Sequence, residues 1–439
     1  MHPRHIKELD GLRGALAPTR IPSLDGFRAV SILLVLVSHS AIAGHWPTIF
    51  VQGVAGVQFF FVISGFLITH LLLQESATTS SIDLRRFYLR RVVRILPVYL
   101  VFVSAITFIS IIARLPLSVC QLITSLTFTK NFGCAEPWFD GHLWSVSIEE
   151  QFYLVWPFLL ARARLRTALL VAIALIVAGP ISRSFGYLNQ LPDVRHYATL
   201  SNADTLMVGC LAALLIRFKP STVSGIVNWR PTIGRGLIFL VGIVGPILLE
   251  QNLIFGKFTV PFSQTVAAIS FAYLICSYSF VRQGVIFLIL NSRPAVFLGC
   301  LSYSIYIWQQ PFFFPGAPLP FPVNIAAILA VASLSYYGLE QPLLGLRRRL
   351  RDSHAARRCA PPCSSTPISQ FVPSLTTGSL FAPPPAIVLK KVVALASVTK
   401  ARAPTPAVDA DGKLETVVEP VTASGLHAQH ARLPRRPPR

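Results

Sequence analysis

SLDGFRAVSILLVLVSHS, the stretch at Ser23–Ser40, decides the fold class. From Ala29 to Val37 almost every residue is apolar, and runs of this kind recur along the chain. A bilayer core about 30 Å thick needs roughly 20 mainly apolar residues per helix. Hydrophobic residues make up 53% of the 439 residues and charged residues 13%, whereas soluble domains carry about 25% charged residues. The sequence therefore predicts an all-α integral membrane protein.

Apolar runs that could form membrane-spanning helices recur about ten times. We expect spans near 27–43, 53–73, 95–113, 143–160, 167–181, 204–217, 236–250, 260–280, 295–314 and 322–340. The apolar piece at 284–290 is too short to cross a bilayer, so it is expected to form a loop or a helix end.

The basic residues give the chain a formal net charge of +21, and most lie in short loops or in the C-terminal tail. Cytoplasmic loops of membrane proteins are enriched in Lys and Arg. With a cytoplasmic N-terminus, the loops expected outside hold only Arg114, Lys130, Arg183, Arg195 and Lys257. This asymmetry predicts that both termini are cytoplasmic. It also favours the lipid bilayer as the partner and argues against nucleic acid.

Composition divides the chain into three parts. Residues 1–20 form a basic N-terminal segment without an apolar core, so no cleavable signal peptide is expected. Residues 21–343 form the membrane domain. Residues 344–439 form a basic, Pro-rich tail, predicted to be disordered and cytoplasmic because it lacks sustained apolar periodicity.

Two ionisable residues stand out in the first apolar run. Arg28 and His39 are eleven residues apart, which places them on one helix face with an axial rise of about 16 Å. His39 either packs against a neighbouring helix or acts as a general base, a role that suits imidazole near neutral pH. Arg28 either reaches the headgroups or binds a substrate anion. Asp25 either caps the helix or orients Arg28.

Two further groups allow a structural and a functional interpretation. Arg91 and Arg94 belong to a basic helix start that either anchors the helix inside or binds the phosphates of a nucleotide-bearing donor. Glu149, followed by a second glutamate, either sits at a helix mouth or faces a polar cavity. Cys120 and Cys134 share one loop and would form a disulfide if that loop faces outward. No metal site is predicted.

Several motifs together carry a resemblance to a known family. They are LDGFRAVSILLVLVSH, FFFVISGFLIT, FYLRRVVRILPVY, HLWSVSIEEQFYLVWP, LSYSIYIW and LEQP, which follow in this order from about Ser23 to Pro342. In this combination the chain resembles acyltransferase family 3, the bacterial multi-pass membrane O-acyltransferases. One position departs from the family pattern, because Gln309 follows Trp308 where many members have histidine.

The resemblance implies a function. It implies acyl transfer, most often acetyl transfer, from cytoplasmic acyl-CoA to a hydroxyl of an envelope or exported glycan, such as a polysaccharide, lipopolysaccharide or lipid-linked glycan. It implies His39 as the catalytic residue and gives Arg91 and Arg94 a role in binding acyl-CoA, and the Glu of the family's HLWS motif falls on Glu149. We therefore expect His39 and Glu149 to be catalytic, and Arg28 and Asp25 to join Arg91 and Arg94 in binding substrate. Acyl-CoA is then a substrate, no tightly bound cofactor is expected, and the location is the bacterial cytoplasmic (inner) membrane.

One alternative function uses the same residues. A secondary transporter or exporter of an anionic or lipid-linked solute would also carry intramembrane His, Arg and Glu. Transporters often contain internal repeats, and none is visible here apart from LDGLRGA at Leu9–Ala15, which echoes LDGFRAV. The sequence therefore favours the acyltransferase.

Overall fold

The computed structural model describes residues 21, 23–44, 53–115, 118–133, 139–228, 231–252, 254–280, 283–314 and 319–346. The chain divides into two units, 1–362 and 363–439. The second unit and the predicted N-terminal segment lie outside the described residues, so the three-part division of the chain remains a prediction. Every regular element in the described ranges is a helix, which confirms the all-α fold class.

The helices follow one another through short connections. In chain order they are α2 (Leu24–Ile42), α3 (Gly53–Thr79), α4 (Leu84–Ile112), α5 (Val119–Leu126), η2 (Lys130–Phe132), α6 (Leu143–Arg162), α7 (Leu165–Leu188), α8 (Pro192–His196), α9 (Thr199–Phe218), α10 (Pro220–Asn228), α11 (Pro231–Phe239), η3 (Leu240–Val244), α12 (Gly245–Gln251), α13 (Gly256–Phe280), α14 (Val285–Leu290), α15 (Arg293–Trp308), η4 (Gln310–Phe313), α16 (Val323–Ser335) and η5 (Tyr336–Glu340).

Eight helical segments in the described ranges are long and apolar enough to cross a membrane. Each of the ten predicted spans corresponds to helical structure, but α6 and α15 are not among the eight. α6 carries Glu149 and Glu150 within its apolar sequence, and α15 has only 16 residues. The structure thus supports a multi-pass membrane protein without fixing the count at ten. The apolar piece at 284–290 is too short to span, as expected, but it forms a separate six-residue helix, α14, and not a loop or a helix end.

Four of the five basic residues assigned to outer loops lie in helical elements: Lys130 in η2, Arg183 in α7, Arg195 in α8 and Lys257 in the first turn of α13. The span predicted to end at residue 181 continues to Leu188, so Arg183 belongs to α7, where it is 2% exposed. It remains buried because it forms an ion pair with Asp204 on α9. Lys130 lies in η2, is 1% exposed, and pairs with Asp140. Burial with an acidic partner explains why Arg183 lies inside a long helix, whereas Lys130 stays in the connection between α5 and α6, as predicted.

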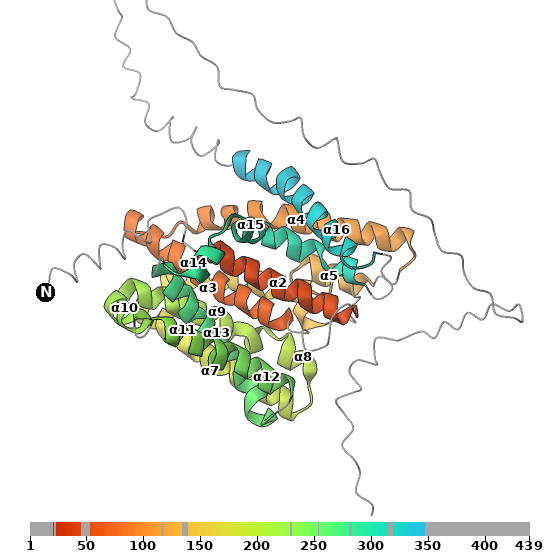
Figure 1. Ribbon diagram of the computed structural model, residues 1–439. Helices are drawn as coiled ribbons and strands as arrows, with labels where there is room; N and C mark the ends of the chain where they lie inside the picture. The colour runs from red at the N-terminus through yellow and green to blue at the C-terminus, as the bar shows by residue number, and fades with distance from the viewer. Residues whose placement is uncertain are drawn as a thin grey trace, which may run out of the picture. The chain divides into compact units, whose positions relative to one another are not determined.

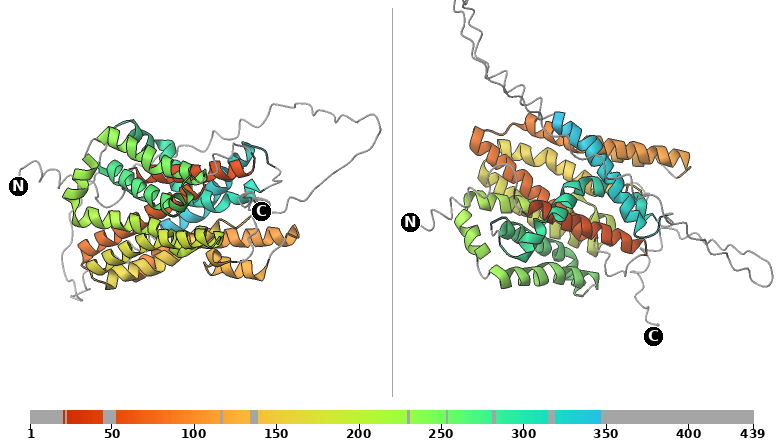
Figure 2. Two further views of the ribbon diagram at one scale, coloured as in Figure 1. Left: turned by 90° about the horizontal axis from the view of Figure 1, so that it is seen from below. Right: turned by 45° about the horizontal axis from the view of Figure 1, so that its top comes forward.

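The helices α2 and α3 form the centre of the bundle. Figure 1 shows α4, α15 and α16 on one side of α2, with α7 and α10–α13 on the other. The other views show most long helices running roughly along a common direction (Figure 2). One hydrophobic core joins α2 and α3 to α4, α6, α15 and α16, and a second joins them to α9 and α13. The central pair is thereby fixed from both sides.

Glycines allow the central helices to approach closely. A Cβ atom added to Gly65 on α3 would overlap the carbonyl oxygen of Leu206 on α9, and one added to Gly209 would overlap that of Val62. Small residues at helix contacts permit such backbone approach in membranes. This reciprocal contact determines which face of α3 packs against α9. It thereby also determines which face of α3 remains to pack against α6.

Candidate active site

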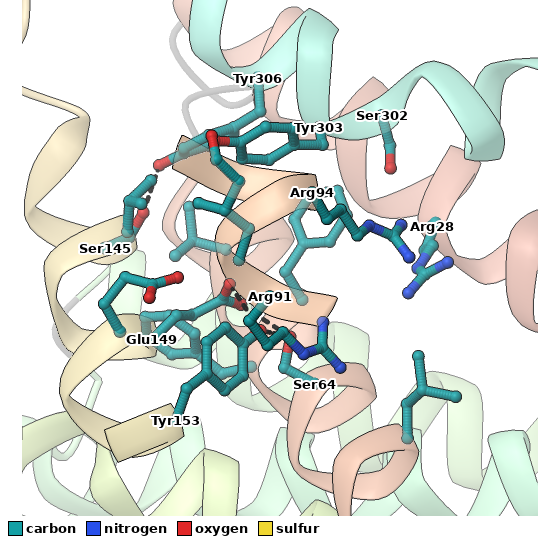
Figure 3. A pocket seen from close by; sticks show the side chains of 17 residues that line it. Arg28, Ser64, Arg91, Arg94, Ser145, Glu149, Tyr153, Ser302, Tyr303 and Tyr306 are labelled. Carbon is teal, nitrogen blue, oxygen red and sulfur yellow. Dashed lines mark hydrogen bonds between the residues drawn. The ribbon is translucent and has the colours of Figure 1, made fainter. Parts of the chain in front are cut away.

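All three arginines that were predicted to bind substrate line one pocket within the bundle. Arg28 comes from α2, and Arg91 and Arg94 come from α4. The remaining lining comes from α3, α6 and α15 and includes Glu149 and Glu150. Figure 3 shows the three guanidinium groups gathered on the same side of the pocket. Three arginines against two glutamates make it an attractive site for an anion.

Helical spacing brings the two arginines of α4 together. Residues three apart lie on one helix face, so Arg91 and Arg94 both reach the pocket. The helix starts at a cap in which the Asp83 carboxylate accepts a hydrogen bond from the backbone N–H of Arg86 at 2.9 Å. The Arg91 guanidinium carbon lies 4.9 Å from the centroid of the Tyr153 ring. A cation over an aromatic face is attracted to it, so the ring holds this guanidinium in place.

Arg28 is held from its own helix. Its Nη1 atom lies 3.5 Å from Oδ1 of Asp25, one turn earlier. This is the orienting contact considered for Asp25 from the sequence. Asp25 is not the N-cap residue of α2, because Ser23 holds that position and Asp25 lies in the first turn.

Glu149 lies beside the arginines but does not meet the predicted catalytic histidine. Its Oε1 accepts a hydrogen bond from Ser64 Oγ at 2.8 Å, and its Oε2 accepts one from Tyr153 O–H at 3.0 Å. No hydrogen bond between described residues joins Glu149 to His39. Glu149 therefore shares the pocket with the arginines, where its negative charge offsets part of theirs, and the idea that it orients His39 gains no support from its hydrogen bonds.

The end of the pocket remote from the arginines is lined by hydroxyl groups. Ser145 Oγ and Tyr306 O–H lie 2.6 Å apart, and the Tyr306 hydroxyl donates to the carbonyl oxygen of His142 at 3.0 Å (Figure 3 shows the serine and tyrosine). The His142 ring lies 5.3 Å from the Tyr306 ring. These contacts connect the pocket to the helix ends where His39 lies.

His39 lies in the last turn of α2 and is not one of the pocket-lining residues. Its Nδ1 is 2.6 Å from Oε1 of Gln309, which follows α15. The adjacent Gln310 accepts a hydrogen bond from the backbone N–H of His142 at 3.0 Å. His39 and His142 thus lie at the same end of the bundle, each beside one of two adjacent glutamines. The arginine pocket is about three helix turns away along α2.

Sequence reasoning anticipated the arginine group but missed its partners. Ser64 and Gln309 contact Glu149 and His39 from segments distant in the sequence. Tyr153 contacts Glu149 from one turn away on α6 and Arg91 on α4. Ser64 and Tyr153 lie inside the motifs that carried the resemblance, yet a serine or tyrosine in an apolar run also suits plain packing. Gln309 was noticed only as a departure from the family pattern.

Comparison with known families decides the identity of the bundle. A family model described as an acyltransferase domain matches residues 21–338. The chain belongs to acyltransferase family 3. The match begins just before α2 and ends within η5, so it includes every pocket-lining residue.

Individual relatives of this family 3 chain are bacterial O-acetyltransferases. It is 27% identical over 374 residues to the O-acetyltransferase OatA of Staphylococcus aureus (strain NCTC 8325), covering 77% of this chain and 59% of the relative. It is 27% identical over 369 residues to the peptidoglycan O-acetyltransferase OatA of Listeria monocytogenes, covering 74% and 56%. The chain therefore spans a little over half the length of these curated relatives. No solved structure shows a significant match.

Proposed function

We propose that this protein transfers an acetyl group from acetyl-CoA, bound at the cytoplasmic side of the inner membrane, to a hydroxyl of a cell-wall glycan. One observation carries the proposal: Arg28, Arg91 and Arg94 face a common cavity from two helices. Guanidinium groups bind phosphate through paired hydrogen bonds, and coenzyme A carries several phosphates. The family supplies the acyl-transfer chemistry, which the arginines alone would not specify.

The relatives support the class of acceptor. Their printed names are O-acetyltransferase and peptidoglycan O-acetyltransferase, so we propose peptidoglycan or its lipid-linked precursor as the glycan. Membership of an acyltransferase family does not favour the transporter alternative. A donor pocket also accounts for the charged residues that this chain carries inside the membrane.

Two independent features support the proposed sidedness. The arginine-rich start of α4 lies at one end of that helix, and basic residues favour the cytoplasm. Beyond the other end of α4, Cys120 in α5 is disulfide-bonded, although Cys134 lies outside the described residues. Disulfides persist in oxidising compartments. The helix α2 runs from Arg28 to His39 in the same direction as α4 runs from its arginine-rich start towards Cys120. The donor phosphates would therefore bind at the cytoplasmic side, and His39 would act near the outer face.

The proposed chemistry uses His39 at the thioester. In direct transfer, its imidazole takes the proton of the acceptor hydroxyl while the hydroxyl oxygen attacks the acetyl carbonyl. The carbon–sulfur bond breaks, and the imidazolium returns the proton to the leaving thiolate. In the alternative route the imidazole first accepts the acetyl group itself. Both routes require a free nitrogen lone pair on His39: the direct route directs it at the acceptor hydroxyl proton, and the acyl-histidine route directs it at the carbonyl carbon.

Acetyl transfer from labelled acetyl-CoA into cell-wall glycan tests the donor assignment. Arg91→Gln or Arg94→Gln should raise the KM for acetyl-CoA roughly 10- to 100-fold, since a hydrogen bond to a charged group contributes about 1.5–3 kcal/mol. Arg90→Gln is the matched control, because Arg90 is on the same helix but pairs with Glu75 at 2.9 Å. An unchanged KM in the Arg91 and Arg94 variants would refute the proposed donor site.

A further inference from the structure

Gln309 makes a direct side-chain contact with the predicted catalytic histidine from 270 residues away. It is fully buried, and its Oε1 lies 2.6 Å from Nδ1 of His39. We infer that Gln309 is a positioning residue for acyl transfer, which holds the His39 proton on Nδ1 and so presents the Nε2 lone pair to the reacting groups. The inference rests on the proposed function, in which His39 performs the transfer.

The direction of the hydrogen bond follows from the chemistry of its atoms. An amide oxygen can only accept a hydrogen bond, whereas a neutral imidazole carries one N–H and one lone pair. Oε1 of Gln309 therefore selects the form of His39 with the proton on Nδ1. The other nitrogen then keeps the lone pair that a general base or a nucleophile needs. The same arrangement serves both the direct and the acyl-histidine route.

The backbone that carries the Gln309 side chain is anchored. The Gln309 backbone N–H donates to the carbonyl oxygen of Ile305 at 3.0 Å, closing the last turn of α15. Gln310 accepts a hydrogen bond from the His142 backbone, and His142 Nε2 lies 3.0 Å from the carbonyl oxygen of Ile307. The end of α15 is thus tied to the start of α6. A buried side chain on an anchored backbone has few other positions to occupy, so it can hold the His39 ring in one orientation during the reaction.

Burial makes the contact consequential. In a low-dielectric interior an unpaired polar group is costly, so loss of the Gln309 oxygen would leave Nδ1–H without its acceptor. The ring would then turn, or the proton would move to Nε2, and in either case the lone pair would no longer face the reacting groups. The structural alternative is that Gln309 merely fills space between α2 and α15, in which case an apolar side chain of equal length would suffice.

Two substitutions of nearly equal size separate these alternatives. Gln309→Glu supplies only acceptor oxygens and keeps the hydrogen bond from Nδ1–H, whereas Gln309→Met keeps the length and removes the acceptor. Gln310→Met removes the hydrogen bond to the His142 backbone N–H and so measures the effect of loosening the end of α15 while the Gln309 side chain is retained. The assay measures kcat and the KM for acetyl-CoA in the labelled transfer reaction.

The inference predicts that Gln309→Met lowers kcat by ~10²-fold, the lower range for loss of acid–base catalysis. The KM for acetyl-CoA stays the same, because Gln309 does not line the arginine pocket. Gln309→Glu should retain kcat to within about tenfold of wild type. Full activity in Gln309→Met would overturn the inference, as would a Gln309→Glu protein that binds donor normally and lacks transfer.

These outcomes are distinct from failure of the proposed function. If wild-type protein shows no transfer that depends on His39, the proposed function itself fails. If wild-type transfer depends on His39 and the Gln309 variants behave alike, the enzyme assignment stands and only the positioning role is lost.

Discussion

The buried ion pair between Arg183 and Asp204 provides a stability test independent of catalysis. Arg183 is 2% and Asp204 0% exposed. The carboxylate oxygens accept hydrogen bonds from Nη1 at 3.0 Å and from Nη2 at 2.8 Å. The guanidinium also donates to Thr265 Oγ1 at 2.7 Å and to the carbonyl oxygen of Pro261 at 2.9 Å. The pair therefore ties α7, α9 and α13 together.

Arg183→Met should destabilise the fold by about 3–5 kcal/mol, because it leaves a buried carboxylate without its counter-charge. At 1.4 kcal/mol per factor of ten, this lowers the folding equilibrium constant by roughly 10²- to 10³-fold or more. The double variant Arg183→Met, Asp204→Asn removes both charges and should recover most of the loss. Arg166→Met, at an exposed arginine on the same helix, is the control.

Unfolding of the purified protein in mixed micelles with increasing denaturing detergent measures these free energies. The single variant should unfold at a lower detergent fraction than wild type, and the double variant should lie between them. The reasoning is refuted if Arg183→Met unfolds like wild type, or if the double variant is no more stable than the single one.

Three other substitutions test the pocket, the packing and the sidedness. Tyr153→Leu should raise the KM for acetyl-CoA about 2- to 30-fold, because it removes the ring beneath Arg91, a contact of about 0.5–2 kcal/mol. Tyr153→Phe keeps the ring and should keep the wild-type KM. Equal KM values for the two variants would contradict this prediction. Gly65→Leu should abolish the monodisperse size-exclusion peak, because a side chain at this position would overlap the backbone of α9. Gly225→Ala should retain the peak, because no atom lies near a Cβ at Gly225. Cys120→Ala should free the cysteine thiol that forms the disulfide with Cys120. If the disulfide faces outward, a membrane-impermeant maleimide should label this thiol on intact cells. Labelling only after lysis would mean that the protein has the opposite orientation in the membrane.

Much of the fold could be predicted because apolar length alone specifies a membrane helix. α2, α3 and α4 lie where their runs predicted, since about 20 apolar residues leave no other stable arrangement in a bilayer. The prediction failed where charge entered a helix. Arg183 was read as a loop residue because its partner Asp204 lies 21 positions away, and only the packing of α7 on α9 shows that the two charges neutralise each other.

The candidate site was predicted in part. Arg91 and Arg94 share a helix, so their spacing could be read directly, and the structure adds Arg28 to them. The link between His39 and Gln309 could not be derived, because a contact across 270 residues depends on how α15 packs against α2. The departure from the family pattern at Gln309 was the only signal in the sequence, and it did not indicate which side chain this residue would meet.

The central claim is that His39 transfers acetyl groups from an inside donor to an outside glycan. The most direct test supplies labelled acetyl-CoA to one side of sealed membrane vesicles and counts label in glycan on the other, with wild type and with His39→Ala. We predict label only in wild-type vesicles that receive acetyl-CoA on the cytoplasmic face. Equal label in His39→Ala vesicles, or label that depends on donor supplied from the outer face, would contradict the account.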